Sequence, residues 1–101
     1  MSGVWADQGA HQGTGVTGQK TVTVAGTAEQ LSTSNVGIHT VVIRGLLANT
    51  GKIYVGFVSG VTSSTGLEVG AGDAITVTTP RLSDIYVNSS VSGEGVSYLA
   101  T

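Results

Sequence analysis

The sequence predicts an all-β fold, and three observations lead to that prediction. Valine, threonine, serine and glycine make up more than half of the 101 residues, whereas charged residues make up only 10 %. Apolar and polar residues alternate over short segments, which is the pattern of half-buried strands. Turn signals recur about every 8 to 12 residues, as in an antiparallel β-sandwich, a jelly roll or a barrel.

Length and composition predict a single domain with an aliphatic core. A chain of about 100 residues is close to the most common domain size. Hydrophobic residues reach 40 % but aromatic residues only 5 %, so valine, isoleucine and leucine must fill the core, and these pack well on a pleated sheet. Cysteine is absent, which leaves packing, hydrogen bonds and association to stabilise the fold.

Residues 1–18 differ from the rest of the chain. Glycine recurs there among glutamine, threonine, histidine and aspartate. Ordering a segment of this composition by itself costs much backbone entropy. We predict a flexible N-terminal arm over residues 1–18 and one β domain over residues 19–101. The arm also contains Val4 and the only tryptophan, Trp5, for which an inert tail has no use. We therefore expect Val4 and Trp5 to contact a partner.

The first half of the domain contains three predicted strands and an extended piece. A strand runs from about Gln19 to Ala25-Gly26, and residues 27–31 are extended. The polar stretch 32–35 favours a loop. Residues 39–47 are the most apolar stretch and the candidate for a central strand with both faces largely covered. A turn at 48–51 joins them to the alternating segment 52–58, which predicts a hairpin over 39–58.

Four further strands are predicted in the second half, at residues 67–69, 74–79, 84–88 and 96–100. Pro80 ends the second of these, because proline has no N–H group to donate to a ladder. Glycine-containing turns at 70–73 and 92–95 precede two of these strands. The total is about eight short strands, whose order in space the pattern leaves open.

Candidate catalytic and metal-ligating residues are few. The spacing Gly13-Thr14-Gly15-Val16-Thr17-Gly18 matches a dinucleotide-binding turn, but such a turn follows a strand and opens a helix, and this one precedes a strand. His11 and His39 lie in different segments, without metal-ligand spacing. Asp73 and Asp84 stand at strand entries, where a carboxylate usually caps the backbone. We expect no enzyme activity, no cofactor and no bound metal.

Two other features have a structural and a functional interpretation. Asn88-Ser89-Ser90 fits the glycosylation sequon, but this triplet is common by chance. Tyr54, Tyr86 and Tyr98 alternate with aliphatic residues, so they either rim the core or form a platform for sugars. Tyrosine commonly buries its ring and leaves its hydroxyl in water, which favours the structural interpretation.

The charge and hydropathy of the chain limit the kinds of partner that it is expected to bind. The net charge is −2 and the four basic residues are scattered along the chain, whereas nucleic-acid binding requires a basic patch. No apolar run approaches the roughly 18 residues that span a bilayer, and the N-terminus lacks a basic region followed by an apolar one. We expect no nucleic-acid partner, no membrane and no secretion signal. So little charge predicts that part of the surface is covered by other subunits.

Several strand-and-turn segments resemble small structural proteins of tailed bacteriophages. The resemblance covers about residues 21–99 and lies in five segments: 48–56, 65–67, 70–73, 82–87 and 92–98. It implies a capsid decoration, or cement, protein that binds the outer head surface and stabilises the capsid. Such proteins are commonly homotrimers that bind the major capsid protein. The implied location is the virion, with the host cytoplasm during assembly.

A second function remains open. A receptor-binding or carbohydrate-binding β-module of a phage tail or head fibre would use exposed Tyr54 or Tyr86 against sugars. In the decoration scheme, by contrast, the N-terminal arm contacts a neighbouring subunit and Trp5 anchors in an apolar pocket.

Overall fold

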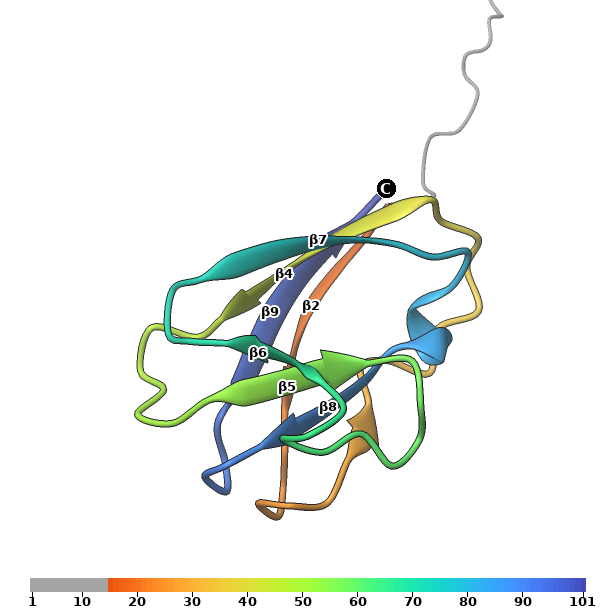
Figure 1. Ribbon diagram of the computed structural model, residues 1–101. Helices are drawn as coiled ribbons and strands as arrows, with labels where there is room; N and C mark the ends of the chain where they lie inside the picture. Colours follow the sequence, from red (N-terminus) through yellow and green to blue (C-terminus); the bar gives the residue numbers. More distant parts are fainter. Residues whose placement is uncertain (1–14) are drawn as a thin grey trace, which may run out of the picture.

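Eight strands form two antiparallel sheets of four strands each (Figure 1). The computed structural model describes residues 15–101. The first sheet has the order β2-β9-β4-β7, and the second has the order β3-β8-β5-β6. Their bounds are β2 Val16–Thr21, β9 Gly95–Ala100, β4 Thr40–Gly45 and β7 Ala74–Thr78, then β3 Glu29–Gln30, β8 Tyr86–Ser89, β5 Ile53–Gly56 and β6 Leu67–Val69. One 3-10 turn, η1 (Leu82–Asp84), precedes β8.

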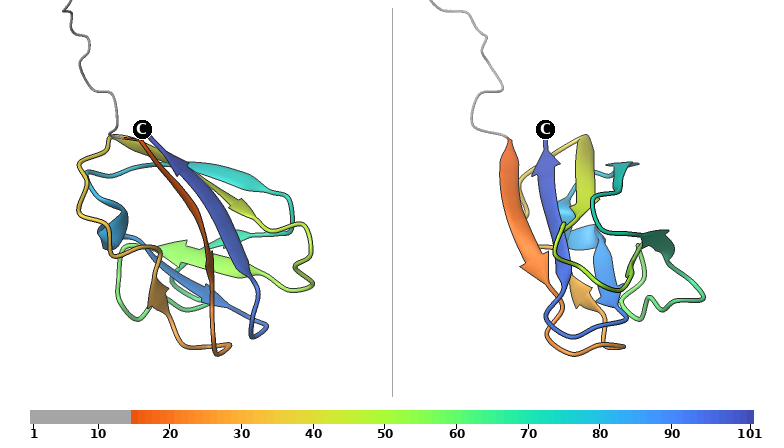
Figure 2. Two further views of the ribbon diagram at one scale, coloured as in Figure 1. Left: turned by 180° about the vertical axis from the view of Figure 1, so that it is seen from behind. Right: turned by 90° about the vertical axis from the view of Figure 1, so that its left-hand side faces the viewer.

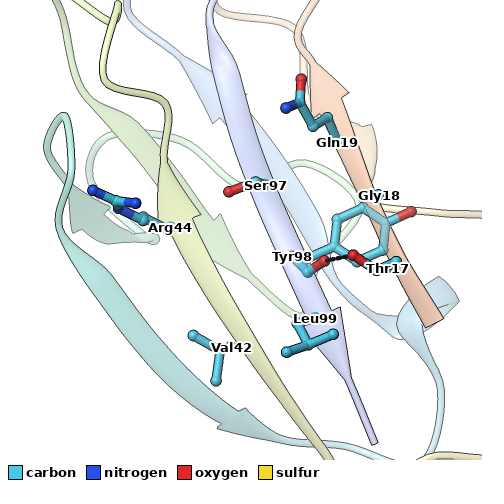
Figure 3. A pocket seen from close by; sticks show the side chains of 8 residues that line it. All are labelled: Thr17, Gly18, Gln19, Val42, Arg44, Ser97, Tyr98 and Leu99. Atoms are coloured by element: carbon cyan, nitrogen blue, oxygen red, sulfur yellow. Dashed lines mark hydrogen bonds between the residues drawn. The ribbon is translucent and has the colours of Figure 1, made fainter. Parts of the chain in front are cut away.

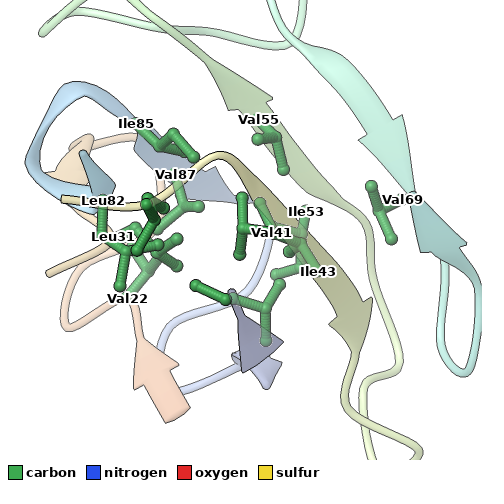
Figure 4. Packing of buried hydrophobic residues seen from close by; sticks show 13 residues of the cluster. Val22, Leu31, Val41, Ile43, Ile53, Val55, Val69, Leu82, Ile85 and Val87 are labelled. Atoms are coloured by element: carbon green, nitrogen blue, oxygen red, sulfur yellow. The ribbon is translucent and has the colours of Figure 1, made fainter. Parts of the chain in front are cut away.

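The two sheets pack face to face as a β-sandwich, with the core between them (Figures 2 and 4). The all-β prediction is thereby confirmed, and the sandwich is the member of the predicted set that the chain adopts. Alternation selects the inward residues: in β4, Val41 and Ile43 are fully buried, while Val42 and Arg44, which alternate with them, are exposed. Each fully buried Val or Ile stabilises the fold by about 1.5–3 kcal/mol relative to an exposed one.

The predicted hairpin over residues 39–58 is wrong. β4 pairs with β7 and β9, whereas β5 pairs with β6 and β8, so the segment between them crosses from one sheet to the other. Hydrogen bonds to two distant parts of the chain hold this connecting segment in place. Leu46 N donates to Gly95 O, and Lys52 N donates to Ser90 Oγ. These distant partners override the local turn signal at 48–51.

The position of β4 in its sheet was predicted correctly, but the covering of both its faces was not. β4 lies between β9 and β7. Its outer face carries Val42, which is 40 % exposed, and Arg44, which is also exposed. The first sheet is therefore covered by protein on its inner side only, and its outer side faces solvent.

The first strand begins earlier than predicted. β2 starts at Val16 and ends at Thr21, so its first three residues fall within the predicted arm, and Val22 and Val24 lie beyond it. Pairing with β9 determines this boundary, because Val16 stands opposite Ala100 and Thr21 opposite Gly95. Residues 1–14 of the predicted arm lie outside the described residues.

The outer face of the second sheet is partly covered by its own loop. Residues 57–66 connect β5 to β6, and Val61 in this loop is fully buried although it does not belong to the main core. A Cβ on Gly56 or Gly66 would come within 3 Å of Val61 Cγ2, so both glycines make room for this side chain. Asn88 Nδ2 donates to Val61 O at 2.9 Å and fastens the loop to β8.

Candidate functional site

The outer face of the first sheet is a regular surface whose residues on β2, β9 and β4 include the exposed Val42 and Leu99. Strand register arranges its side chains in two rows. Thr17, Leu99 and Val42 stand opposite one another on β2, β9 and β4. The second row has the same order of strands and contains Gln19, Ser97 and Arg44. We call these six residues the β2–β9–β4 face.

A hollow of about 520 Å³ lies on the β2–β9–β4 face (Figure 3). It is wide and open, and Gly18 and Tyr98 line it together with the six residues of the face. Gly18 is required here by a close approach, because a Cβ at this position would lie 2.7 Å from Tyr98 Oη. Thr17 Oγ1 donates to Tyr98 O at 3.2 Å, which fixes the rim of the hollow to β9.

The β2–β9–β4 face combines apolar and polar side chains with one positive charge. Leu99 is 57 % exposed and Val42 40 % exposed, and hydroxyl or amide groups surround them. Arg44 is the only charged residue of the face. Its Nε donates to Gly72 O at 3.3 Å, and within residues 15–101 no carboxylate lies within 4 Å of it. Apolar contacts with polar groups around them are typical of protein–protein interfaces.

The two carboxylates with altered acidity hold loops in place. A hydrogen bond from Lys20 Nζ at 2.8 Å, followed by one from Thr23 N, lowers the pKa of Glu29. Hydrogen bonds from Gly51 N and Thr50 N likewise lower the pKa of Glu94. Both groups are held ionised by structural partners, which is the opposite of what a general acid at neutral pH requires.

The other sequence candidates are dispersed. Asp73 Oδ2 accepts from Gly70 N at 3.3 Å and closes a turn, and Asp84 Oδ2 lies 3.9 Å from Arg81 Nε. His39 is an exposed residue whose backbone N–H donates to Thr101 O. Among residues 15–101, no three His, Cys, Asp or Glu side chains are grouped closely enough to hold a metal ion. In the described part of the glycine motif, Gly15 directly precedes β2 and residues 16–18 belong to it, so the motif opens no helix.

The sequon asparagine is a structural residue. Asn88 is 3 % exposed, its Nδ2 donates to Val61 O and its Oδ1 accepts from Ser89 N. The amide nitrogen that a glycan would require is therefore buried in β8 and the loop that covers it.

The three tyrosines do not form one platform. Tyr54 and Tyr86 lie on adjacent strands of the second sheet, where Tyr54 stands opposite Asn88 and Tyr86 opposite Gly56. Tyr98 lies in the first sheet and packs against the core. Tyr54 borders a hollow of about 360 Å³ that Thr62, Ser63 and Ser90 also line, while Tyr86 borders a different one.

The predicted contact residues Val4 and Trp5 lie outside the described residues, as does His11. Sequence reasoning missed the β2–β9–β4 face. The residue pattern indicates only weakly that Val42 and Leu99 point outward. Each lies within a run of apolar residues, and such a run resembles a strand buried on both sides. Only the pairing of β2, β9 and β4 brings these residues together.

Comparison with known proteins adds no relative: no protein-family model, no curated protein and no solved structure matches the chain. Between residues 15 and 101, no helix has the length and hydropathy needed to cross a membrane.

Proposed function

We propose that this protein is a structural protein of a bacteriophage virion that decorates the outer surface of the head. It binds the major capsid protein and stabilises the capsid as a homo-oligomer, with a trimer as the expected state. The observation that supports this proposal best is the β2–β9–β4 face, a regular sheet surface with two exposed aliphatic side chains and one charge. Such a surface suits contact with protein better than catalysis.

Weak contacts are sufficient for this role. Burial of Leu99 and Val42 against a capsid subunit removes apolar surface from water, and the surrounding hydroxyl and amide groups supply hydrogen bonds. Three linked copies that reach three capsid sites bind with avidity, because the second and third contacts form at high effective concentration. Val4 and Trp5 in the N-terminal segment are a second proposed contact.

The face can be tested with a double variant, V42T and L99T. Threonine is favourable in strands, so the fold should persist while apolar area is lost. We expect binding to undecorated heads to weaken about tenfold or more, which corresponds to about 1.4 kcal/mol. Occupancy measured by electron microscopy or by co-sedimentation with heads reports the change.

Leu47→Thr is the control, because Leu47 is 73 % exposed and does not belong to the face. Full occupancy by the double variant would remove the face from the mechanism. Deletion of residues 1–14 tests the N-terminal contact separately and leaves β2 intact, because β2 starts at Val16.

The carbohydrate-binding alternative retains one supporting observation. Tyr54 borders a hollow that four serine or threonine residues also line, and a tyrosine ring beside hydroxyl groups is a suitable surface for a sugar. Glycan-array binding by the wild-type protein that disappears in Tyr54→Ala, without any binding to heads, would favour this alternative.

A further inference from the structure

β6 and β7 are the edge strands of their sheets and lie on the same side of the sandwich (Figure 1). An apolar groove of about 310 Å³ lies there between the two sheets. The groove is more enclosed than the hollow on the β2–β9–β4 face. Six apolar side chains line it: Val55, Phe57, Leu67, Ile75, Val77 and Ile85.

Strand length explains the groove. β6 has only three residues and β7 has five, so β6 cannot cover the full length of β7. Ile75 and Val77 point inward but are only half-buried, whereas Ile43 and Val41, their partners on β4, are fully buried. At the rim, Phe57 is 59 % and Leu67 57 % exposed. The groove thus exposes core residues of a kind that a folded domain normally covers.

The edge of β7 supplies a second way to hold a ligand. Within the described chain β7 pairs with β4 alone, so its other edge has backbone N–H and C=O groups without a strand partner. An extended segment can add to such an edge through main-chain hydrogen bonds and place a side chain in the adjacent groove. No charged side chain lines the groove, so an apolar, uncharged segment is its best occupant.

The chain itself contains a short segment of this kind. Residues 3–6, Gly-Val-Trp-Ala, precede the described domain, carry no charge and include the only tryptophan. The volume of the groove is at the lower end of the roughly 300–1,000 Å³ of ligand pockets, which is suitable for one large side chain. About ten residues separate Trp5 from β2, and an extended chain of that length spans roughly 35 Å.

The point of attachment is compatible with exchange between copies. Val16, at the start of β2, is in the same row as Val77, with Ala100 and Val41 between them. β2 and β7 are nevertheless opposite edges of the sheet, so the segment enters the domain on the side away from its own groove. A second copy can present its groove on that nearer side.

We propose that Trp5 of one copy inserts into the β6–β7 groove of a second copy, with the neighbouring residues paired along β7. This inference deepens the self-association in the proposed function and rests on it. It assigns Phe57 and Leu67 as the rim that encloses the indole ring, and it links the copies independently of the β2–β9–β4 face.

Fluorescence of the single tryptophan tests the proposal directly. In the full-length protein we expect Trp5 emission to be blue-shifted relative to the denatured protein, and to shift to the red on dilution as the oligomer dissociates in sedimentation. Leu67→Thr should raise acrylamide quenching of Trp5 several-fold and weaken self-association. Leu99→Thr is the matched control, because Leu99 is also a strand residue with 57 % exposure, and it should leave quenching unchanged.

Three results would overturn the proposal. Trp5 that is quenched as freely as in the denatured protein at every concentration would mean that Trp5 does not occupy the groove. Protection that persists in the monomer would place Trp5 in its own groove. Protection lost in Leu99→Thr but kept in Leu67→Thr would place it on the β2–β9–β4 face. Failure to bind heads would count against the decoration role alone, because these readouts use the isolated protein.

Discussion

The carboxylate of Glu94 connects two loops that are far apart in the sequence. It accepts hydrogen bonds from Thr50 N and Thr50 Oγ1 at 2.8 Å and from Gly51 N at 2.9 Å. These donors satisfy backbone groups in the connection between β4 and β5 and tie it to the turn before β9. They favour the ionised carboxylate, which is why the pKa of Glu94 is lowered.

Glu94→Gln should therefore reduce stability in a pH-dependent way. A lowered pKa in the folded state stabilises the fold above the pKa of the unfolded chain, and this contribution is lost as the pH falls through the folded-state pKa. We expect the variant to have a lower free energy of unfolding than the wild type at pH 7. The difference should shrink in acid, as measured by urea unfolding over a series of pH values.

Glu68→Gln is the matched control, because Glu68 is exposed and its carboxylate accepts no hydrogen bond within residues 15–101. A difference between wild type and Glu94→Gln that stays constant with pH would contradict the proposed role of the charge.

At the scale of the strands, Gly95 allows β9 to pair with β2. It stands opposite Thr21, and a Cβ at this position would collide with Lys20 O and lie 2.6 Å from Thr21 Cα. These are backbone atoms of a paired strand, which cannot move aside as a flexible side chain can. Asn49 also binds Gly95 through both amide atoms, at 2.8 and 3.2 Å, so the position is fixed from two sides.

Gly95→Ala should consequently lower the free energy of unfolding by about 1–3 kcal/mol, the usual cost of overpacking. Chemical denaturation followed by circular dichroism measures the loss. Gly37→Ala provides the comparison, since a Cβ there meets nothing within 4 Å and the backbone is outside the left-handed region. Equal stability of the two variants would contradict the steric argument.

Alternation in the sequence predicted where strands lie, but not which strands pair. The segments 67–69, 74–79 and 96–100 agree with β6, β7 and β9 to within a residue. The predicted hairpin failed because pairing depends on contacts between distant residues, such as Leu46 with Gly95. The start of β2 was missed because Gly15 and Gly18 resemble a loop until Tyr98 and Ala100 are placed beside them.

The candidate site was less predictable than the fold for the same reason. An exposed aliphatic residue is informative only when its neighbours on the adjoining strands are known. Val42 and Leu99 are 57 residues apart in the sequence and directly opposite one another in the sheet. The groove was not predictable either. It forms because the short strand β6 leaves part of β7 uncovered, and this is apparent only when the positions of both strands in the fold are known.

For the whole molecule, scarcity of charge predicts how association responds to salt. The β2–β9–β4 face has one charged residue and the β6–β7 groove has none. Salt screens contacts between charges, with a Debye length near 10 Å at 0.1 M and about 3 Å at 1 M, but it does not weaken apolar burial. We expect self-association, measured by sedimentation equilibrium, to be unchanged or stronger at high salt. A steep decrease would point to an interface held by charge.

The place of β9 in the first sheet has a consequence for biosynthesis. β9 is an inner strand, paired with β2 on one side and β4 on the other, and it follows the other seven described strands in the sequence. Until residue 100 leaves the ribosome, β2 has no partner in its sheet and the inner residues of β4 are covered only by β7 and the second sheet. The nascent domain must therefore stay unfinished, with apolar strands open to chaperones or to other copies, and complete its fold in one late step.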